Sequence, residues 1–131
     1  MIAGGVGITP FLSQLRHIRL AASDVQVTLI WGNKTRRDII AGDEFHALTR
    51  RVPLKIVHVL SREPDGPLEG SDRIAYERGH IDQDILKRHI EEPAASYYLC
   101  GPEPLQEVVL RHLHEAFGIP RVQVRRELFF F

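Results

Sequence analysis

Apolar side chains recur with two spacings in this sequence, one that suits helices and one that suits buried strands. Helical spacing predicts amphipathic helices at residues 9–22, 43–51, 81–90 and 105–117. Continuous apolar or β-branched runs predict strands at residues 25–31, 53–60, 96–100 and 122–129, with residues 1–3 as the end of one more. Because strands alternate with helices, we expect a doubly wound α/β fold with about five parallel strands, in one domain over residues 1–131.

A glycine-rich turn follows the first predicted strand, where Gly4, Gly5 and Gly7 precede Thr9 and Pro10. Thr9 can cap a helix, and Pro10 suits the first turn of that helix. Glycines let a ligand approach the backbone, and a helix N-terminus offers free N–H groups, so the turn suits a pyrophosphate. Such a turn can also be purely structural. The spacing differs from a dinucleotide fingerprint and no P-loop lysine follows, which disfavours a kinase or an ATPase.

A second turn of this kind lies at the end of the strand predicted at residues 96–100, where Cys100, Gly101 and Pro102 lead into a helix. A cysteine in such a position is most often an inert, buried side chain. In doubly wound sheets, however, ligands bind at the carboxyl ends of the strands where the strand order reverses. We expect this strand to neighbour the first one across that point, so that both turns flank one crevice.

Composition excludes several classes of function. The chain has 17 Lys and Arg residues against 17 Asp and Glu residues, so no net charge draws it to nucleic acid or to an anionic membrane. The single cysteine, Cys100, allows neither an internal disulfide nor a cysteine-rich metal site, and we expect no bound metal. The longest apolar runs are too short to span a bilayer. We expect a cytoplasmic domain, at the cytoplasmic face of the membrane if its parent protein has membrane segments.

Six stretches of the sequence together point to one family. They are IAGGVGITPFLSQL (2–15), WGNKTRRDI (31–39), LSRE (60–63), GHID (79–82), YYLCGPEPL (97–105) and RELF (126–129). In this order and spacing they closely resemble the nucleotide-binding, C-terminal domain of the ferredoxin-NADP reductase superfamily. The resemblance implies a Rossmann-like domain that binds NAD(P)H and passes hydride to FAD, which a separate antiparallel β-barrel domain holds. Electrons then leave for an iron-sulfur protein, a haem or a ferric complex.

The resemblance also implies roles for individual residues. Cys100, Glu127 and Phe129 match positions beside the nicotinamide or the flavin, where a thiol positions the ring without acting as a covalent nucleophile. The residues that match dinucleotide-binding positions are Gly4, Gly5, Val6, Gly7, Thr9, Pro10, Asn33, Gly101 and Pro102.

The choice between NADPH and NADH depends on the long segment at residues 61–79, which we predict to be a loop. Ser61 and Arg62 match the Ser-Arg pair that grips the 2'-phosphate in NADP-dependent members, and a guanidinium suits a phosphate dianion. Arg73 and Tyr76 are expected to complete that site. Acidic residues such as Glu63 surround the pair and oppose an extra phosphate. NADPH is therefore favoured only slightly over NADH.

Residues 36–38 suggest a solvated start to the second helix. His46 and His58 have no second histidine at metal-ligand spacing, so we expect structural roles for both.

The family's flavin-binding signature, Arg-x-Tyr-Ser/Thr, does not occur in this sequence. We therefore expect a domain that lacks both the FAD-binding barrel and the start of its first strand, inactive by itself and prone to self-association through its exposed face. A nucleotide-binding or sensing module without redox chemistry is the alternative. A flavodoxin-like FMN carrier is a weaker one, because the first turn has no Ser/Thr-rich phosphate loop.

Overall fold

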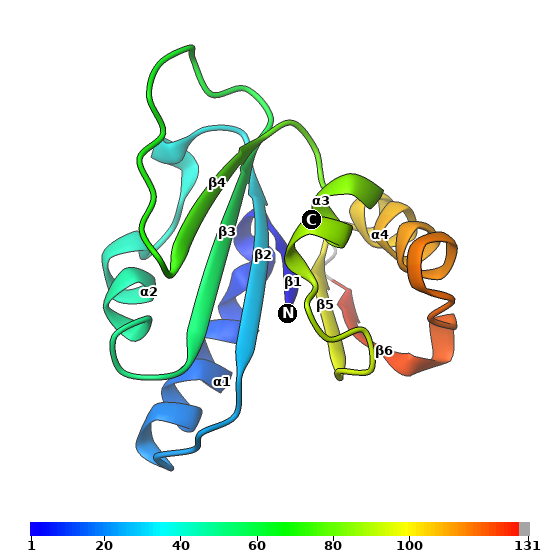
Figure 1. Ribbon diagram of the computed structural model, residues 1–131, viewed down its shortest axis with the longest axis horizontal. Coiled ribbons are helices and arrows are strands. Elements are labelled where there is room, and N and C mark those ends of the chain that lie inside the picture. Colours follow the sequence, from blue (N-terminus) through cyan, green and yellow to red (C-terminus); the bar gives the residue numbers. More distant parts are fainter. Residues whose placement is uncertain (129–131) are drawn as a thin grey trace.

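The computed structural model describes residues 1–128 (Figure 1). Its strands are β1 Ile2–Gly4, β2 Val27–Asn33, β3 Leu54–Leu60, β4 Ile74–Arg78, β5 Tyr97–Gly101 and β6 Val124–Leu128. Its α-helices are α1 Thr9–Leu20, α2 Gly42–Leu48, α3 Gln83–His89 and α4 Glu103–Phe117. Three short 3₁₀ helices, η1 Gly5–Ile8, η2 Arg36–Asp38 and η3 Arg121–Gln123, complete the described elements.

The strands form one sheet in the order β4-β3-β2-β1-β5-β6, and all neighbouring pairs are parallel. The strand order reverses at β1, which pairs with β2 on one side and with β5 on the other. The doubly wound α/β fold is therefore confirmed, as is the expectation that the first strand neighbours the strand carrying Cys100. The sheet has six strands rather than about five, because part of the segment predicted as a loop forms β4.

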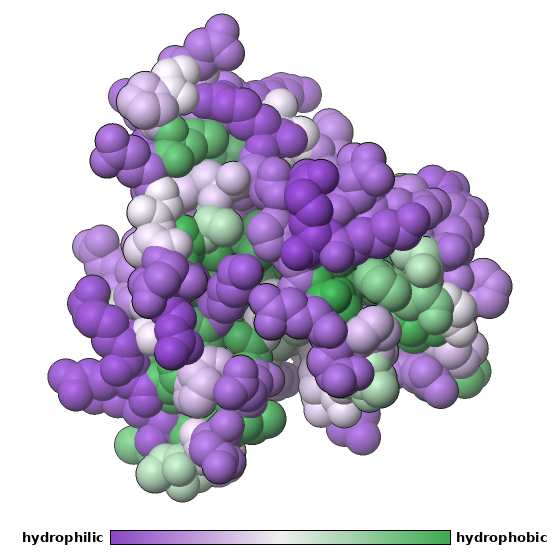
Figure 2. All heavy atoms as spheres, in the orientation of Figure 1, coloured by the Kyte–Doolittle hydropathy of each residue, from purple (hydrophilic) through white to green (hydrophobic). Residues whose placement is uncertain are grey.

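Helices cover both faces of the sheet, with α1 and α2 on one face and α3 and α4 on the other (Figure 1). On the first face, Phe11, Leu15 and Phe45 pack against Trp31 of β2. The buried residues on the second face include Leu86, Val109 and Leu113. In Figure 2, hydrophilic residues dominate this view, and hydrophobic residues show only in small, separate areas. Among residues 1–128, no helix combines the length and the apolar character needed to cross a bilayer.

The glycine turn differs from the prediction at its helical end. Gly5–Ile8 already forms η1, which runs directly into α1, so the N-cap of α1 is Ile8 in a helical conformation. Thr9 therefore does not cap the helix, and its hydroxyl donates instead to the carbonyl of Val6 at 3.0 Å. Pro10 does lie in the first turn, as predicted. The second helix, Gly42–Leu48, ends three residues before the predicted residue 51. Arg36–Asp38 forms the separate turn η2 and not the start of that helix.

Candidate functional site

The two glycine-containing turns lie backbone against backbone at the carboxyl ends of β1 and β5. A Cβ atom at Gly7 would lie 2.7 Å from both the carbonyl oxygen of Cys100 and the Cα of Gly101, so the turn fits only without a side chain here. A Cβ at Gly4 would clash with the side chain of Leu105 on α4. Gly7 thus lets the two turns approach each other, Gly4 lets the first turn pack against α4, and both turns flank one crevice.

Gly5 has a different role, because it lies in the left-handed region with φ +52° and a Cβ there would meet no atom within 4 Å. The carbonyl of Gly5 accepts a hydrogen bond of 3.1 Å from the indole N–H of Trp31. Trp31 is fully buried, so it holds the turn from beneath while the outer side of Gly5 stays open to a ligand.

A groove of about 720 Å³ opens between this turn, the ends of β2 and β3, and the start of α4. The predicted cofactor-binding residues in its lining are Gly4, Gly5, Val6, Asn33, Ser61 and Pro102. Apolar residues, among them Ile40, Ile81 and Leu105, make up much of the rest. Such a concave, largely apolar surface with a few polar groups at a topological switch point is typical of a nucleotide site.

Ser61 reaches the rim of the groove because the pairing of β2 with β3 continues beyond both strands. The amide of Ser61 donates to the carbonyl of Asn33 at 3.0 Å, and the amide of Arg62 donates to Lys34 at 2.8 Å. Arg62 is exposed beside the rim, and Lys34, which sequence reasoning overlooked, contributes a cation to the lining.

Glu63 does not face this rim as a free carboxylate. It accepts hydrogen bonds from the backbone amide of Arg36 at 2.7 Å and from its guanidinium at 2.9 Å. These hydrogen bonds, the backbone one first, lower the pKa of Glu63 and keep it ionised against a cation. Glu63 is one of the acidic residues that surround Ser61 and Arg62 in the sequence, and its negative charge is therefore balanced by Arg36.

In the paired register of β3 and β4, Arg73 and Tyr76 lie before the end of the sheet that carries Ser61, and their part in a 2'-phosphate site stays a prediction. The carbonyl of Arg73 accepts from Ile56, at the start of β4, whereas Ser61 lies beyond the other end of the β3–β4 pair. The ring of Tyr76 stacks on His58, with centroids 5.2 Å apart. Because β3 and β4 are parallel, Arg78 takes the place near Ser61.

Arg78 is committed to the local backbone. Its guanidinium donates to the carbonyls of Glu63, Pro64 and Gly66 at 2.8, 3.1 and 2.8 Å, and so holds the loop after β3 in place.

Cys100 and Glu127 are neighbours in the paired register of β5 and β6. Cys100 is fully buried in the core under α1, while Glu127 is exposed. Burial first, and then the charge of Glu127, raise the pKa of the thiol to about 11. The thiol is therefore neutral at physiological pH, which agrees with a role other than nucleophile. Phe129, the third predicted catalytic residue, lies outside the described residues.

His46 of α2 and His58 of β3 lie together, which sequence spacing did not show. Their Nε2 atoms are 3.1 Å apart, so one ring donates a hydrogen bond to the other. Burial lowers the pKa of His58 to about 4 and also lowers that of His46. Among residues 1–128, no group of three or more His, Cys, Asp or Glu side chains is placed to hold a metal ion.

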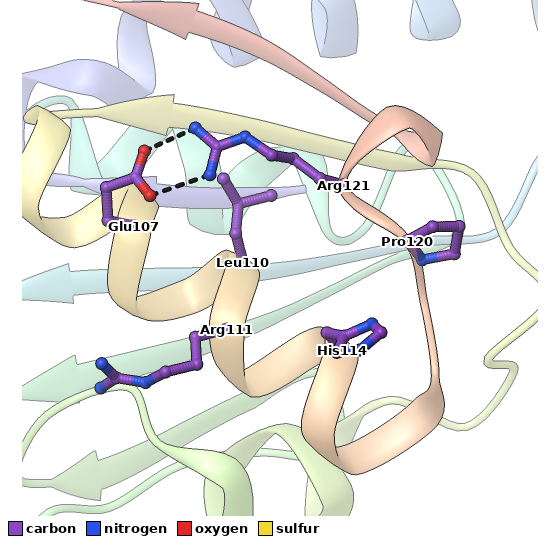
Figure 3. Close-up of a pocket in the computed structure, with 6 residues that line it drawn as sticks. All are labelled: Glu107, Leu110, Arg111, His114, Pro120 and Arg121. Carbon is purple, nitrogen blue, oxygen red and sulfur yellow. Dashed lines mark hydrogen bonds and ion pairs between the residues drawn. The ribbon is translucent and has the colours of Figure 1, made fainter.

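A second, smaller hollow of about 350 Å³ lies between α4 and the segment at Pro120 and Arg121 (Figure 3). Glu107 there accepts two hydrogen bonds from the guanidinium of Arg121, at 2.6 and 2.9 Å. None of the predicted site residues lines this hollow. The groove at the switch point is therefore the better candidate for the functional site.

The groove fits a dinucleotide on features of this structure. Gly5 leaves its outer side open, and the buried Nδ2 of Asn33 has no hydrogen-bond partner among the described residues. An unpaired buried donor at a groove is a place where a ligand can accept a hydrogen bond. The fold and the groove together define the class of this protein as a dinucleotide-binding domain.

Comparison with known proteins agrees with this class. The model of the oxidoreductase NAD-binding domain family matches residues 1–111, and the chain belongs to this family. It is 37% identical over 123 residues to human NADH-cytochrome b5 reductase 2, covering 90% of this chain and 42% of that protein. It is 36% identical over 124 residues to the reductase component of propane 2-monooxygenase from Rhodococcus jostii (strain RHA1), covering 94% of this chain and 33% of that protein.

Solved structures show the same relationship. The cytochrome b5 reductase domain of Ulva prolifera nitrate reductase is similar with a TM-score of 0.80 and 29% identity, over 97% of this chain and 47% of that one. The flavohemoglobin of Malassezia yamatoensis, solved with bound FAD and heme, is similar with a TM-score of 0.79 and 25% identity, over 98% of this chain and 30% of that one. The chain thus spans less than half the length of each of these relatives.

Proposed function

We propose that this chain is the NAD(P)H-binding domain of a flavin-dependent reductase, and that it delivers hydride to FAD on a separate domain. One observation carries the proposal: the glycine turn after β1 and the Cys-Gly-Pro turn after β5 meet at the rim of one groove at the switch point of the sheet. The proposed partners are an FAD-binding barrel domain and, beyond it, a haem or iron-sulfur acceptor.

The chain's own residues would bind and orient the nucleotide. The turn at Gly5 and Val6 would hold the pyrophosphate, Asn33 would donate its free amide hydrogen, and Pro102 would flank the nicotinamide end. Cys100 and Glu127 would shape that end, with Cys100 as a neutral thiol. When bound, NAD(P)H supplies the hydride and FAD accepts it.

NADPH is the proposed nucleotide, in preference to NADH. Ser61 at the rim, the exposed Arg62 and the nearby Lys34 offer a hydroxyl and two cations to a 2'-phosphate. The compensation of Glu63 by Arg36 removes one opposing charge. The relative from Homo sapiens is named an NADH reductase, so the preference has to be measured on this chain.

The fluorescence of Trp31 can measure nucleotide binding, because Trp31 is the only tryptophan in the sequence and contacts the glycine turn through Gly5. We expect saturable quenching of its emission by NADPH and weaker binding of NADH. Arg62→Met should remove the preference, whereas Arg16→Met, at an exposed arginine paired with Glu44, should retain it. Equal affinities of the unaltered chain for the two nucleotides would contradict the roles of Ser61 and Arg62.

A nucleotide-binding module without redox chemistry is the second candidate, because Cys100 is buried and lies outside the lining of the groove. Joining the chain to an FAD-binding barrel domain and following flavin reduction by NADPH distinguishes the two. Hydride transfer that slows in Cys100→Ser or Glu127→Gln, at unchanged nucleotide affinity, supports the reductase. Binding without flavin reduction supports the second candidate. Saturation by FMN alone, without any effect of NADPH, would favour a flavodoxin-like carrier.

A further inference from the structure

Gln106 is a fully buried polar residue in the apolar stripe of α4, on the face that it shares with Val109, Leu110 and Leu113. Its Nε2 donates one hydrogen bond of 2.9 Å to the carbonyl of Gly101 and one of 2.5 Å to the carbonyl of Glu127. Both partners can only accept, so the two hydrogens of the carboxamide nitrogen are both used. Nothing in helix packing alone requires glutamine here, since an apolar residue would fill the same stripe.

The two carbonyls belong to the ends of β5 and β6. Gly101 is the last residue of β5, and Glu127 lies next to the end of β6. Within the part of the chain that the structure describes, β6 pairs with the sheet only through β5. The end of an edge strand has few other contacts to fix it. Gln106 therefore joins the backbone after Cys100 to the backbone that carries the Glu127 side chain.

We propose that Gln106 is a positioning residue, which fixes Glu127 against Cys100 and so sets the geometry of the nicotinamide end of the groove. The effect of Gln106 on hydride transfer rests on the proposed function. Whether Gln106 fixes Glu127 against Cys100 can be tested without any nucleotide. The carboxamide acts through the backbone of its two partners. Its loss should therefore loosen the end of β6 more than it affects the glycine turn at Gly5.

Cys100 is the reporter for this test, because it is the only cysteine in the sequence and it is fully buried. Gln106→Leu keeps a side chain of similar size and removes both donors. We expect alkylation of Cys100 in the folded chain to become about tenfold faster, as expected when buried carbonyls lose their partners. Val109→Ala, on the same buried face of α4, is the matched control for lost stability. If Gln106→Leu accelerates labelling no more than Val109→Ala at equal stability, the proposal is overturned.

Gln106→Glu gives a second readout that a purely structural role would not change. A neutral carboxyl group can donate one hydrogen bond to these carbonyls, whereas the ionised group can donate none. In the chain joined to its FAD domain, the rate constant of flavin reduction should fall about tenfold at high pH and recover partly at low pH, with the KM for NADPH within about twofold. The proposal would be overturned if the ratio of the flavin-reduction rate constants of Gln106→Glu and the unaltered protein did not change with pH.

The two proposals fail in different ways. A chain that binds no NADPH contradicts the proposed function, and the labelling of Cys100 still decides whether Gln106 fixes the end of β6. A chain that binds NADPH and reduces flavin equally well with leucine at position 106 contradicts the positioning role alone.

Discussion

Acid should destabilise this domain through His58. The ring is completely buried on β3 between Trp31, Tyr76 and His46. Its Nε2 shares a hydrogen bond with His46, and its Nδ1 has no partner among residues 1–128. A second proton on the ring would therefore add a charge and an unpaired donor in the core.

The size of the effect follows from the pKa of His58, which burial, and then the neighbouring His46, lower from 6.5 to about 4. The unfolded chain takes up this proton below pH 6.5, and the folded chain does so only near pH 4. The stabilisation is thus fully present above pH 6.5 and is lost as the pH falls towards 4. At about 1.4 kcal/mol for each pKa unit, the loss is roughly 3 kcal/mol.

Urea unfolding followed by far-UV circular dichroism, between pH 7.5 and pH 4.5, measures this loss. The His58→Leu variant should lose about 2.5 kcal/mol less of its free energy of unfolding over that range, because it has no ring to protonate. His46 is present in both proteins; burial lowers its pKa, and the charges of Asp43 and Arg50 act on it in opposite directions. The exposed His17→Gln serves as the control and should follow the unaltered protein. Identical pH dependence of the unaltered and His58→Leu proteins would refute the reasoning.

Three further changes test the groove. Gly7→Ala places a Cβ 2.7 Å from backbone atoms of β5 and should lower the free energy of unfolding in urea by about 1–3 kcal/mol, whereas Gly32→Ala should be tolerated. Ser61→Asp adds a carboxylate at the rim and should weaken NADPH binding about tenfold more than NADH binding in calorimetric titrations. Arg36→Met removes the guanidinium that balances the charge of Glu63, although the backbone hydrogen bond remains, and should shift selectivity in the same direction by a smaller factor.

These variants have clear contrary outcomes. Arg16→Met breaks a comparable ion pair, with Glu44, and should leave nucleotide selectivity unchanged. Equal effects of Arg16→Met and Arg36→Met would show that Glu63 has no special role. A Gly7→Ala protein as stable as the unaltered one would contradict the close approach of the two turns.

The sequence predicted those parts of the fold that one periodicity dominates. The continuous apolar runs of β2 and β3 and the apolar stripe of α4 all match elements of the structure. It missed β4, because Ile74–Arg78 has a run of only three apolar or aromatic residues before Glu77 and Arg78 and follows a stretch rich in Gly, Pro and charge. Among the described residues, β4 also pairs on one side only. An edge strand that is half-exposed shows little of the buried pattern from which strands are predicted.

The candidate site was predictable where short motifs carry it and unpredictable where strand register decides it. The turn at Gly5 and the rim residue Ser61 were found by motif and both line the groove. The place of Arg73 relative to Ser61 could not be predicted, because it depends on how β4 pairs with β3. Gln106 did leave a signal, a polar residue in an apolar helical stripe, but its partners come from two strands that only the fold brings together.

The central claim is that a nicotinamide dinucleotide binds in the groove at the switch point of the sheet. Titration of the 131-residue chain with NADP+, followed by backbone amide chemical shifts, tests this claim most directly. The amides of Gly5, Val6 and Ser61 should shift and saturate together, while those of Glu107 and Arg121 at the second hollow should not. Saturable shifts confined to the second hollow, or no saturable shift at any amide, would contradict it.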